Sequence, residues 1–237
     1  MNELDMRRIK VGSTELNHIG FLEAVGAKRR PVFLSTGLGT LAEVELAVAA
    51  LRRGGGNDLP ITVLQCTSEY PAPPEEMNLR VLETYAKALQ VPVGLSDHST
   101  GGEASIAALA LGASVIEKHF TLSRTMAGPD HSASLEPMEL AQFVGGLRKV
   151  AAMLGDGIKR PTRSELRNMS GIRRSVAAAR DLAEGTVLAA ADMVCKRPGT
   201  GVLPADMSKL VGLRLNRAMA FDEPISWTDV QSVRQPG

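Results

Sequence analysis

Aromatic residues and cysteines are scarce in this chain of 237 residues. Phe, Trp and Tyr make up only 3% of the sequence, so the core has to be packed mainly by Ala, Leu and Val. The two cysteines, Cys66 and Cys195, are too few and too far apart for a disulfide framework or a structural zinc site. We therefore expect a reducing, cytoplasmic setting.

The chain also lacks a strong charge and a long apolar run. Its formal net charge of +1 gives no reason to expect nucleic acid or an anionic membrane as a partner. It has no apolar run of about 18 residues, and the start MNELDMRRIK has no signal-peptide pattern. Any anionic substrate would therefore have to be held by local groups and not by a global field.

Short apolar segments recur along the first half of the chain, and they are continuously apolar, as strands covered on both faces are. They are RIKVGS (8–13), PVFLST (31–36), ITVLQCT (61–67), VPVGLSD (91–97) and ASVIEKHF (113–120). Helical patterns occupy most of the intervals and follow the last strand. These cover 41–53, 76–89, 102–112 and 137–154. Thr40 and Glu43 have the spacing of a capping box at the first of these helices.

This alternation of strand and helix predicts parallel βαβ units, in either a barrel or a doubly wound sheet. A closed barrel needs eight strands and the sequence offers five, so any absent strands would precede Met1. We predict three regions along the chain. Residues 1–154 form the α/β domain, the polar residues 155–170 form a linker, and 171–237 form a small, mainly β domain.

Two histidines end neighbouring strands of this predicted sheet. Because side chains alternate faces with a period of two, Ser96 and His98 share one face, as do Glu117 and His119. On parallel neighbouring strands the two histidines could converge at one rim. They could then hold a divalent cation of the Mn, Zn or Fe type, with positions left for water and substrate. The alternative is that each is a buried histidine satisfied by a nearby backbone group.

The same rim has features of an anion site. Ser96 is followed by two glycines and a helix start, where backbone N–H groups favour an anion. Lys10, Ser13 and Ser35 come from other strand ends and would extend the pocket, although such serines are often only turn or cap residues. Lys10 lies within an apolar run, and a buried lysine needs a partner, for which an anionic ligand is suited.

Three further residues are candidates from their residue type alone. Glu15 and Asp130 could contact hydroxyl groups or transfer protons, or they could be solvated loop carboxylates. Arg197 stands beside a Pro-Gly turn, where an arginine is usually a surface charge.

Taken together, these motifs resemble the sialic acid (N-acetylneuraminate) synthase family in order and spacing. The matching segments are KVGSTE (10–15), LSTG (34–37), CTSEYPAP (66–73), VGLSDHSTG (93–101), GASVIEKHF (112–120) and GPDHSASLEP (128–137). The segments RRSVAAARDLAEG and KRPGTG resemble the C-terminal antifreeze-like (SAF) domain of that family. The resemblance covers essentially the whole chain.

The resemblance implies an incomplete (β/α)8 TIM barrel of about five βα units, followed by a SAF domain. It implies a transferase that condenses phosphoenolpyruvate with an N-acetylated hexosamine, such as N-acetylmannosamine, and forms a nonulosonic acid and phosphate. The implied cofactor is Mn2+, or another divalent cation such as Mg2+ or Co2+. The implied assembly is a domain-swapped homodimer in which the SAF domain covers the partner's active site.

The resemblance also assigns roles to individual residues. His98 and His119 would bind the metal. Phosphoenolpyruvate would be bound by Lys10, Ser13, Ser35 and Ser96. The sugar would be contacted by Glu15, Tyr70 and Asp130, with Glu15 also a candidate catalytic residue, and Arg197 would reach the N-acetyl group.

Two departures qualify this reading. About three βα units of the family barrel have no counterpart here. We therefore hypothesise that the chain is a fragment or one half of a split enzyme. The alternative function is that of a ligand-binding or dimerising module. Ser68 stands where many members have asparagine beside the sugar.

A third hypothesis is an aldolase with Lys118 as a Schiff-base lysine. It ranks low, because strand alternation points that side chain away from Glu117 and His119.

Overall fold

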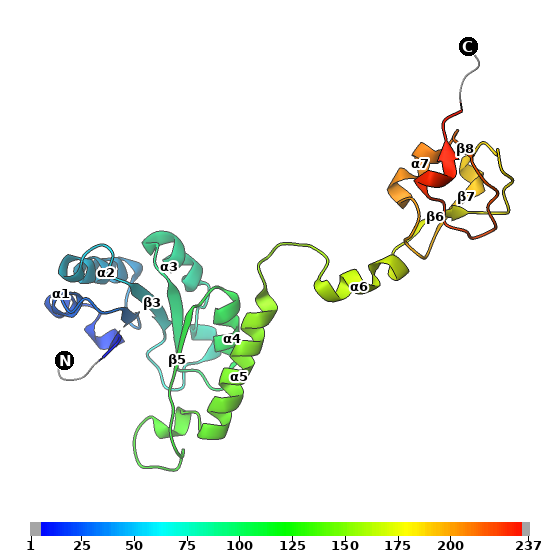
Figure 1. The fold of residues 1–237 in the computed structure, drawn as a ribbon. Helices are drawn as coiled ribbons and strands as arrows, with labels where there is room; N and C mark the ends of the chain where they lie inside the picture. The colour runs from blue at the N-terminus through cyan, green and yellow to red at the C-terminus, as the bar shows by residue number, and fades with distance from the viewer. Residues whose placement is uncertain (1–5, 234–237) are drawn as a thin grey trace. The chain divides into compact units, whose positions relative to one another are not determined.

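The structure is a computed structural model that describes residues 6–233. The chain divides into two compact units, residues 1–157 and 158–237. Five parallel strands form the sheet of the first unit (Figure 1). They are β1 (Ile9–Val11), β2 (Val32–Ser35), β3 (Ile61–Cys66), β4 (Val93–Asp97) and β5 (Val115–Lys118). The prediction of five strands is confirmed, since each predicted segment contains one of them.

Strand order distinguishes the two architectures that the sequence allowed. The order in the sheet is β1-β2-β3-β4-β5, so each strand pairs with the next strand along the chain. A doubly wound sheet would reverse its order at a switch point, whereas a barrel winds in one direction. The first unit is therefore half of a TIM barrel.

Within its described residues 6–157, this unit contains five α-helices. They are α1 (Ile19–Gly26), α2 (Leu41–Gly55), α3 (Val81–Leu89), α4 (Glu103–Ala110) and α5 (Pro137–Leu154). The capping box predicted at Thr40 and Glu43 is present, and α2 ends at Gly55 with Gly56 as its C-cap. The helix predicted from residue 76 begins instead at Val81, after a short 3-10 turn over Pro74–Glu76.

Helix α1 was missing from the sequence prediction, because it has only eight residues and two of them are glycine. One of these glycines allows close packing against α2. A Cβ on Gly26 would lie 2.1 Å from the Leu51 carbonyl oxygen, and one on Gly54 would lie 2.0 Å from the Glu23 carbonyl oxygen. The two helices therefore touch backbone to backbone, which only residues without a side chain permit.

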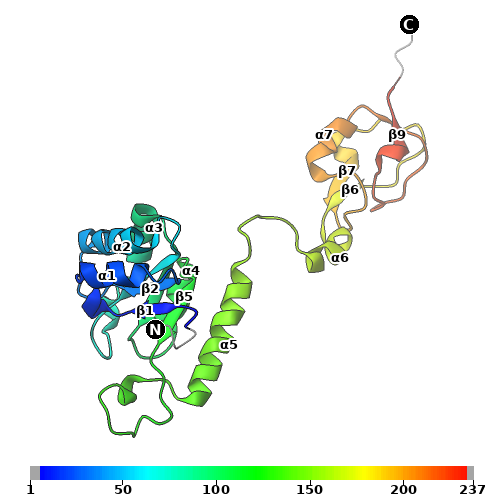
Figure 2. The ribbon, with the colours of Figure 1, turned by 60° about the vertical axis from the view of Figure 1, so that its left-hand side comes forward.

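One face of the sheet carries the apolar core. Val11, Leu34, Val63 and Val93 are aligned across four strands, and all four are buried. They belong to one hydrophobic cluster with residues of α1, α2, α3 and α4, which cover this face (Figure 2). The opposite face, which we call the inner face, carries Lys10, Ser35, Cys66, Ser96 and Glu117, because side chains alternate along each strand.

The sheet is strongly curved around this inner face. Lys10 lies on β1 and Glu117 lies on β5, at opposite edges of the sheet. Four strand spacings would separate them by about 19 Å on a flat sheet. Yet Lys10 Nζ lies 3.4 Å from Glu117 Oε1. The inner face is therefore the concave interior of the half-barrel, and polar groups from both edges meet inside it.

The second unit contains the small β region that was predicted for residues 171–237, preceded by a helix. It contains α6 (Arg163–Ile172), β6 (Ser175–Ala178), β7 (Met193–Lys196), α7 (Met207–Leu210), β8 (Arg214–Leu215) and β9 (Val230–Gln231). Strands β6 and β7 form one antiparallel pair, and β8 and β9 form another. Helix α6 starts at a capping box of Thr162 and Glu165, so a helix begins within the predicted linker, residues 155–170, and extends two residues beyond it.

One turn motif occurs twice in the second unit. An arginine pairs with an aspartate that ends a 3-10 turn, and a short strand begins at the next residue. Arg180 Nη2 lies 2.7 Å from Asp192 Oδ1 before β7, and Arg217 Nε lies 2.8 Å from Asp229 Oδ1 before β9. Each aspartate also accepts a hydrogen bond from the backbone N–H three residues earlier.

These contacts lower the pKa values of both aspartates. A backbone hydrogen bond from Ala189, with help from Arg180, lowers the pKa of Asp192. Burial raises the pKa of Asp229, but its hydrogen bonds with Arg217 and with Ser226 outweigh burial, so the pKa is lowered overall. Both carboxylates are therefore more acidic in the folded unit. Over the described residues 6–233, no helix is long and apolar enough to cross a membrane.

Candidate active site

The two strand-end histidines lie together at the carboxyl end of the half-barrel. Strands β4 and β5 are neighbours, and Ser96 is aligned with Glu117 in their register. The next residue on the same face of each strand is a histidine. The rings of His98 and His119 are 5.2 Å apart between centroids and almost perpendicular, at 88°. The predicted convergence of His98 and His119 at one rim is therefore what the structure shows.

A backbone carbonyl fixes the orientation of one imidazole. His98 Nδ1 lies 2.7 Å from the carbonyl oxygen of Thr67, the residue that follows β3. An Nδ1–H donating to this oxygen leaves Nε2 with its lone pair, which is the tautomer that binds a metal through Nε2. Thr67 gave no signal in the sequence for this role, because the contact uses its backbone.

Burial and neighbouring groups shift the pKa values of the two imidazoles in opposite directions. Burial lowers the pKa of His98, but the hydrogen bond and charge of Cys66, together with the Thr67 carbonyl, raise it by more. Burial lowers the pKa of His119, and the charge of nearby His98 lowers it further. His119 is accordingly held towards its neutral form, the form that can coordinate a cation.

Tyr70 and Asp130 border the histidines. The Tyr70 ring lies 4.1 Å from the His98 ring and 5.2 Å from the His119 ring, measured between centroids. Asp130 Oδ2 lies 3.9 Å from His119 Nδ1. These two residues were expected at the sugar. The structure places them beside His98 and His119, and their contact with a sugar stays a prediction.

Lys10, Ser96 and Glu117 form a polar network on the inner face. Ser96 Oγ donates to Glu117 Oε1 at 2.7 Å, and Lys10 approaches the same oxygen at 3.4 Å. Lys10 is not the buried lysine that the sequence suggested: it is exposed because β1 is an edge strand of the described sheet. Glu117 was not selected as a site residue, although its place two residues before His119 on the same face was a usable signal.

Ser13 and Ser35 lie on the β1 and β2 side of the inner face. Ser13 Oγ accepts a hydrogen bond from Gly37 N at 2.9 Å. A Cβ on Gly37 would lie 2.1 Å from Ser68 Oγ and 2.9 Å from Ser13 Oγ, so these groups crowd one spot. Ser35 is 2% exposed, and its Oγ has no hydrogen-bond partner among the described residues. A buried hydroxyl without a partner is unfavourable unless a ligand satisfies it.

Two predicted site residues are not brought into this network. Glu15 lies in a 3-10 turn after β1, half-exposed, with its Oε2 3.5 Å from His18 Nδ1. Arg197 belongs to the second unit, where it is exposed after β7. Their roles stay predictions.

The donor set at this rim fits a divalent cation bound by two imidazoles. The rings of His98 and His119 are 5.2 Å apart between centroids, and imidazole nitrogens are ligands that Mn, Zn and Fe ions accept. No cluster of three or more His, Cys, Asp or Glu side chains with metal-binding geometry occurs within residues 6–233. The remaining positions would fall to water and substrate.

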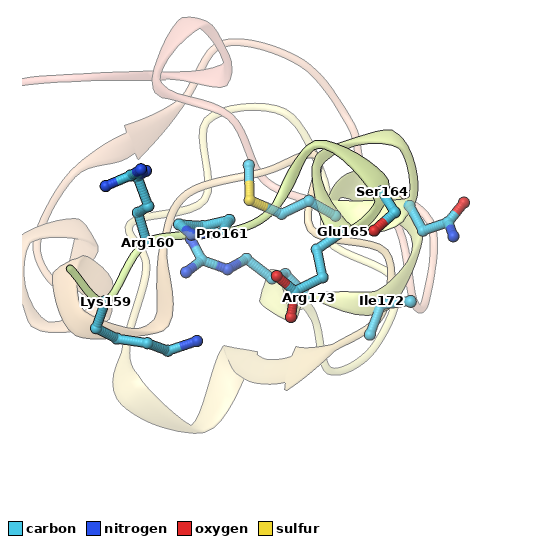
Figure 3. Close-up of a pocket in the computed structure, with 9 residues that line it drawn as sticks. Lys159, Arg160, Pro161, Ser164, Glu165, Ile172 and Arg173 are labelled. Atoms are coloured by element: carbon cyan, nitrogen blue, oxygen red, sulfur yellow. The ribbon is translucent and has the colours of Figure 1, made fainter. Parts of the chain in front are cut away.

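A separate hollow of about 560 Å³ lies beside α6 in the second unit (Figure 3). Its walls include Lys159, Arg160, Met169, Ile172 and Arg173. It contains none of the residues that the sequence singled out. The strand-end cluster of the half-barrel is therefore the candidate active site.

Comparison with known proteins places the chain in a family. The chain belongs to the NeuB family, whose family model matches residues 1–159, and a SAF domain follows at residues 173–231. The family and the SAF domain inferred from the sequence motifs are thus confirmed.

Characterised relatives show the same relationship. N,N'-diacetyllegionaminic acid synthase of Campylobacter jejuni is 38% identical over 225 residues, which are 95% of this chain and 67% of the relative. N-acetylneuraminate-9-phosphate synthase of Homo sapiens is 38% identical over 228 residues, 95% of this chain and 62% of the relative. The crystal structure of N-acetylneuraminic acid (sialic acid) synthetase from Leptospira borgpetersenii is 35% identical, with a TM-score of 0.65 over 70% of this chain and 57% of that one. The chain thus spans about two thirds of the length of its curated relatives.

Proposed function

We propose that this chain acts in nonulosonic acid synthesis: it condenses phosphoenolpyruvate with an N-acetylated hexosamine, a water molecule adds at C2, and phosphate leaves. The observation that supports this proposal best is the approach of His98 and His119 to 5.2 Å on the face that also carries Ser35 and Ser96. One cation site and one anion site thereby adjoin each other. That combination is what a metal-assisted condensation with an anionic substrate requires.

The chemistry explains why both sites are needed. C3 of phosphoenolpyruvate is a weak carbon nucleophile, so the aldehyde of the acceptor sugar has to be polarised. A divalent cation such as Mn2+, held by His98 and His119, would supply this Lewis acidity. The Thr67 carbonyl orients His98, and Lys10 and the serine hydroxyls orient the phosphate and carboxylate groups.

Glu117 sets a condition on substrate binding. Its carboxylate holds both Ser96 and Lys10. An incoming anion would have to take these two donors from Glu117, which would turn aside or accept a proton. Ser35 needs no such exchange, because its Oγ has no partner among the described residues. We therefore assign Ser35 and Ser13 to the anion from its entry onward, and Lys10 and Ser96 join them at the bound anion once Glu117 has released them.

We assign the acceptor side to the other predicted residues. Tyr70 and Asp130 lie beside the histidines and would contact the sugar, with Glu15 available for proton transfer. Arg197 would reach the N-acetyl group from the SAF domain of a partner in a domain-swapped homodimer. We expect the purified chain to sediment as a dimer. We also expect Arg197→Ala to lose affinity for the acceptor sugar. We also propose a cytoplasmic location, in keeping with two free cysteines.

A second function has structural support of its own. Strands β1 and β5 each pair with only one neighbour among the described residues. A site built on an open half-barrel could bind phosphoenolpyruvate or dimerise without completing turnover. This module would bind ligand at the same residues and release no phosphate.

Phosphate release in the presence of Mn2+, phosphoenolpyruvate and N-acetylmannosamine distinguishes the two functions. We expect release that disappears in His98→Ala and in His119→Ala, with the fold intact. Lys87→Ala is the control, because Lys87 pairs with Glu83 on the exposed side of α3 and none of the proposed site residues contacts it. Binding of phosphoenolpyruvate without release would favour the module. Absence of both binding and release would contradict the synthase and the ligand-binding module, and would leave only a module that dimerises.

A further inference from the structure

A buried ion pair lies directly behind the two histidines, on the helix-facing side of the sheet. Asp97 ends β4 and Lys118 ends β5, and the two residues are aligned in the register of these strands. Lys118 Nζ lies 3.1 Å from Asp97 Oδ2, and the side chains are 4% and 0% exposed. Lys118 therefore points toward the helix layer, as strand alternation predicted.

Hydrogen bonds from two serines complete the surroundings of this pair. Asp97 Oδ1 accepts from the backbone N–H of Ser99 at 2.9 Å and from its hydroxyl at 2.6 Å. Asp97 Oδ2 accepts from the hydroxyl of Ser105 on α4 at 2.5 Å. Lys118 Nζ donates to the carbonyl oxygen of Ser99 at 2.5 Å. The pair thus ties together the ends of two strands, the loop after His98, and the first turn of α4.

We infer that Asp97 and Lys118 are positioning residues for the pair of histidines, an inference that rests on the proposed function of that pair in binding metal. Each residue of the ion pair immediately precedes one of the histidines in the chain. The backbone positions of His98 and His119 are therefore fixed by side chains on the opposite face of the sheet. Neither Asp97 nor Lys118 is on the face that would touch the metal.

The physical reason is the cost of separating buried charges. A carboxylate and an ammonium away from water are stable only when paired and hydrogen-bonded. Any slip of β5 along β4, or any opening of the loop after His98, would separate Asp97 from Lys118 or from Ser99. The arrangement that satisfies all these groups is the same one that brings the two imidazoles together. Breaking the pair should let the rings diverge and weaken the affinity for the cation.

Mn2+ binding to the full chain, followed by electron paramagnetic resonance of the free ion, tests this inference without reference to turnover. The single variant Lys118→Met leaves Asp97 as an unpaired buried carboxylate and could unfold the unit. Mn2+ binding is therefore also measured in the double variant Asp97→Asn/Lys118→Met, which removes both charges. Lys87→Met is the matched control, because Lys87 pairs with Glu83 on the exposed side of α3.

We expect the double variant to keep the near-ultraviolet circular dichroism of the wild type and to bind Mn2+ about 10–100-fold more weakly, the range for residues that orient metal ligands. Lys87→Met should bind Mn2+ as the wild type does. Unchanged Mn2+ affinity in a folded double variant, with only a lower melting temperature, would overturn the positioning role and leave the metal site standing. A wild-type chain whose Mn2+ binding is absent, or is unaffected by His98→Ala, would overturn the metal site and the positioning role together.

Discussion

Replacing Ser35 by alanine should stabilise the first unit and weaken its binding of phosphoenolpyruvate. The Ser35 side chain is buried, and its Oγ has no hydrogen-bond partner among the described residues. Most buried hydroxyls in folded proteins are hydrogen-bonded, so a hydroxyl left alone on the inner face is a cost to folding that a ligand would remove. A purely structural serine would have the opposite effect on stability when replaced.

The magnitude follows from the burial of the hydroxyl. A buried polar group without a partner costs about 1–3 kcal/mol, and the small void left by Oγ offsets part of that gain. We expect Ser35→Ala to raise the free energy of unfolding by about 1 kcal/mol, which is an increase of about 2–4 °C in melting temperature. A hydrogen bond to a charged group contributes about 1.5–3 kcal/mol, so affinity for phosphoenolpyruvate should fall about 10–100-fold.

Thermal unfolding and isothermal titration calorimetry measure the two effects. Ser105→Ala is the matched control for stability, because Ser105 is fully buried and its hydroxyl donates to Asp97. The control should lower the melting temperature, since it leaves a buried carboxylate oxygen short of a donor. Equal losses of stability in both variants, or an unchanged affinity for phosphoenolpyruvate in Ser35→Ala, would refute the assignment of Ser35 to the anion site.

Three other changes test the site and the fold. Glu117→Gln should bind phosphoenolpyruvate about two- to five-fold more tightly by calorimetry, because the half-exposed ion pair with the lysine of β1 no longer competes; equal or weaker binding would contradict the competition. The lowered pKa values of Asp192 and Asp229 stabilise the SAF domain above about pH 4, and this contribution is lost as the pH falls further. The Asp192→Asn/Asp229→Asn variant should therefore lose less melting temperature than the wild type between pH 7 and pH 3, and an identical loss would argue against the two capped turns as its source. Gly54→Ala should destabilise the first unit by about 1–3 kcal/mol in urea unfolding, because its Cβ would meet a carbonyl oxygen of α1 at 2.0 Å, whereas Gly145→Ala, with nothing within 4 Å, should not destabilise it.

The elements of the half-barrel could be predicted where local signals agree. The five strands are continuously apolar and are separated by helices with clear caps, such as Thr40 with Glu43. Helix α1 escaped prediction because its formation depends on packing against α2, through Gly26 and Gly54, and not on its own residues. Helix α6 was overlooked because a polar, exposed helix lacks the apolar pattern of a core helix.

The face of the sheet on which each site residue lies was also predictable, since it depends only on whether residues are an even or an odd number of positions apart along the strand. It placed Ser96 with His98 and Lys118 on the opposite face, and both are confirmed by the register of β4 and β5. The hydrogen-bond partners were not predictable. Thr67 acts through its backbone, and the link between Ser99 and Lys118 joins residues whose contact depends on the loop between β4 and α4.

Curvature of the sheet explains both the error over Lys10 and the chemistry of the site. Within β1 the sequence shows a lysine in an apolar run, which suggested a buried lysine that would pair with an anionic ligand. In the structure that lysine is exposed at the sheet edge and contacts Glu117 of β5 across the concave face. A flat sheet would keep the two residues about 19 Å apart. Bending therefore converts residues that are distant along the sheet into one polar network. The polar network consequently depends on the geometry of the whole half-barrel, and a change that flattened the sheet would separate Lys10 from Ser96 without touching either.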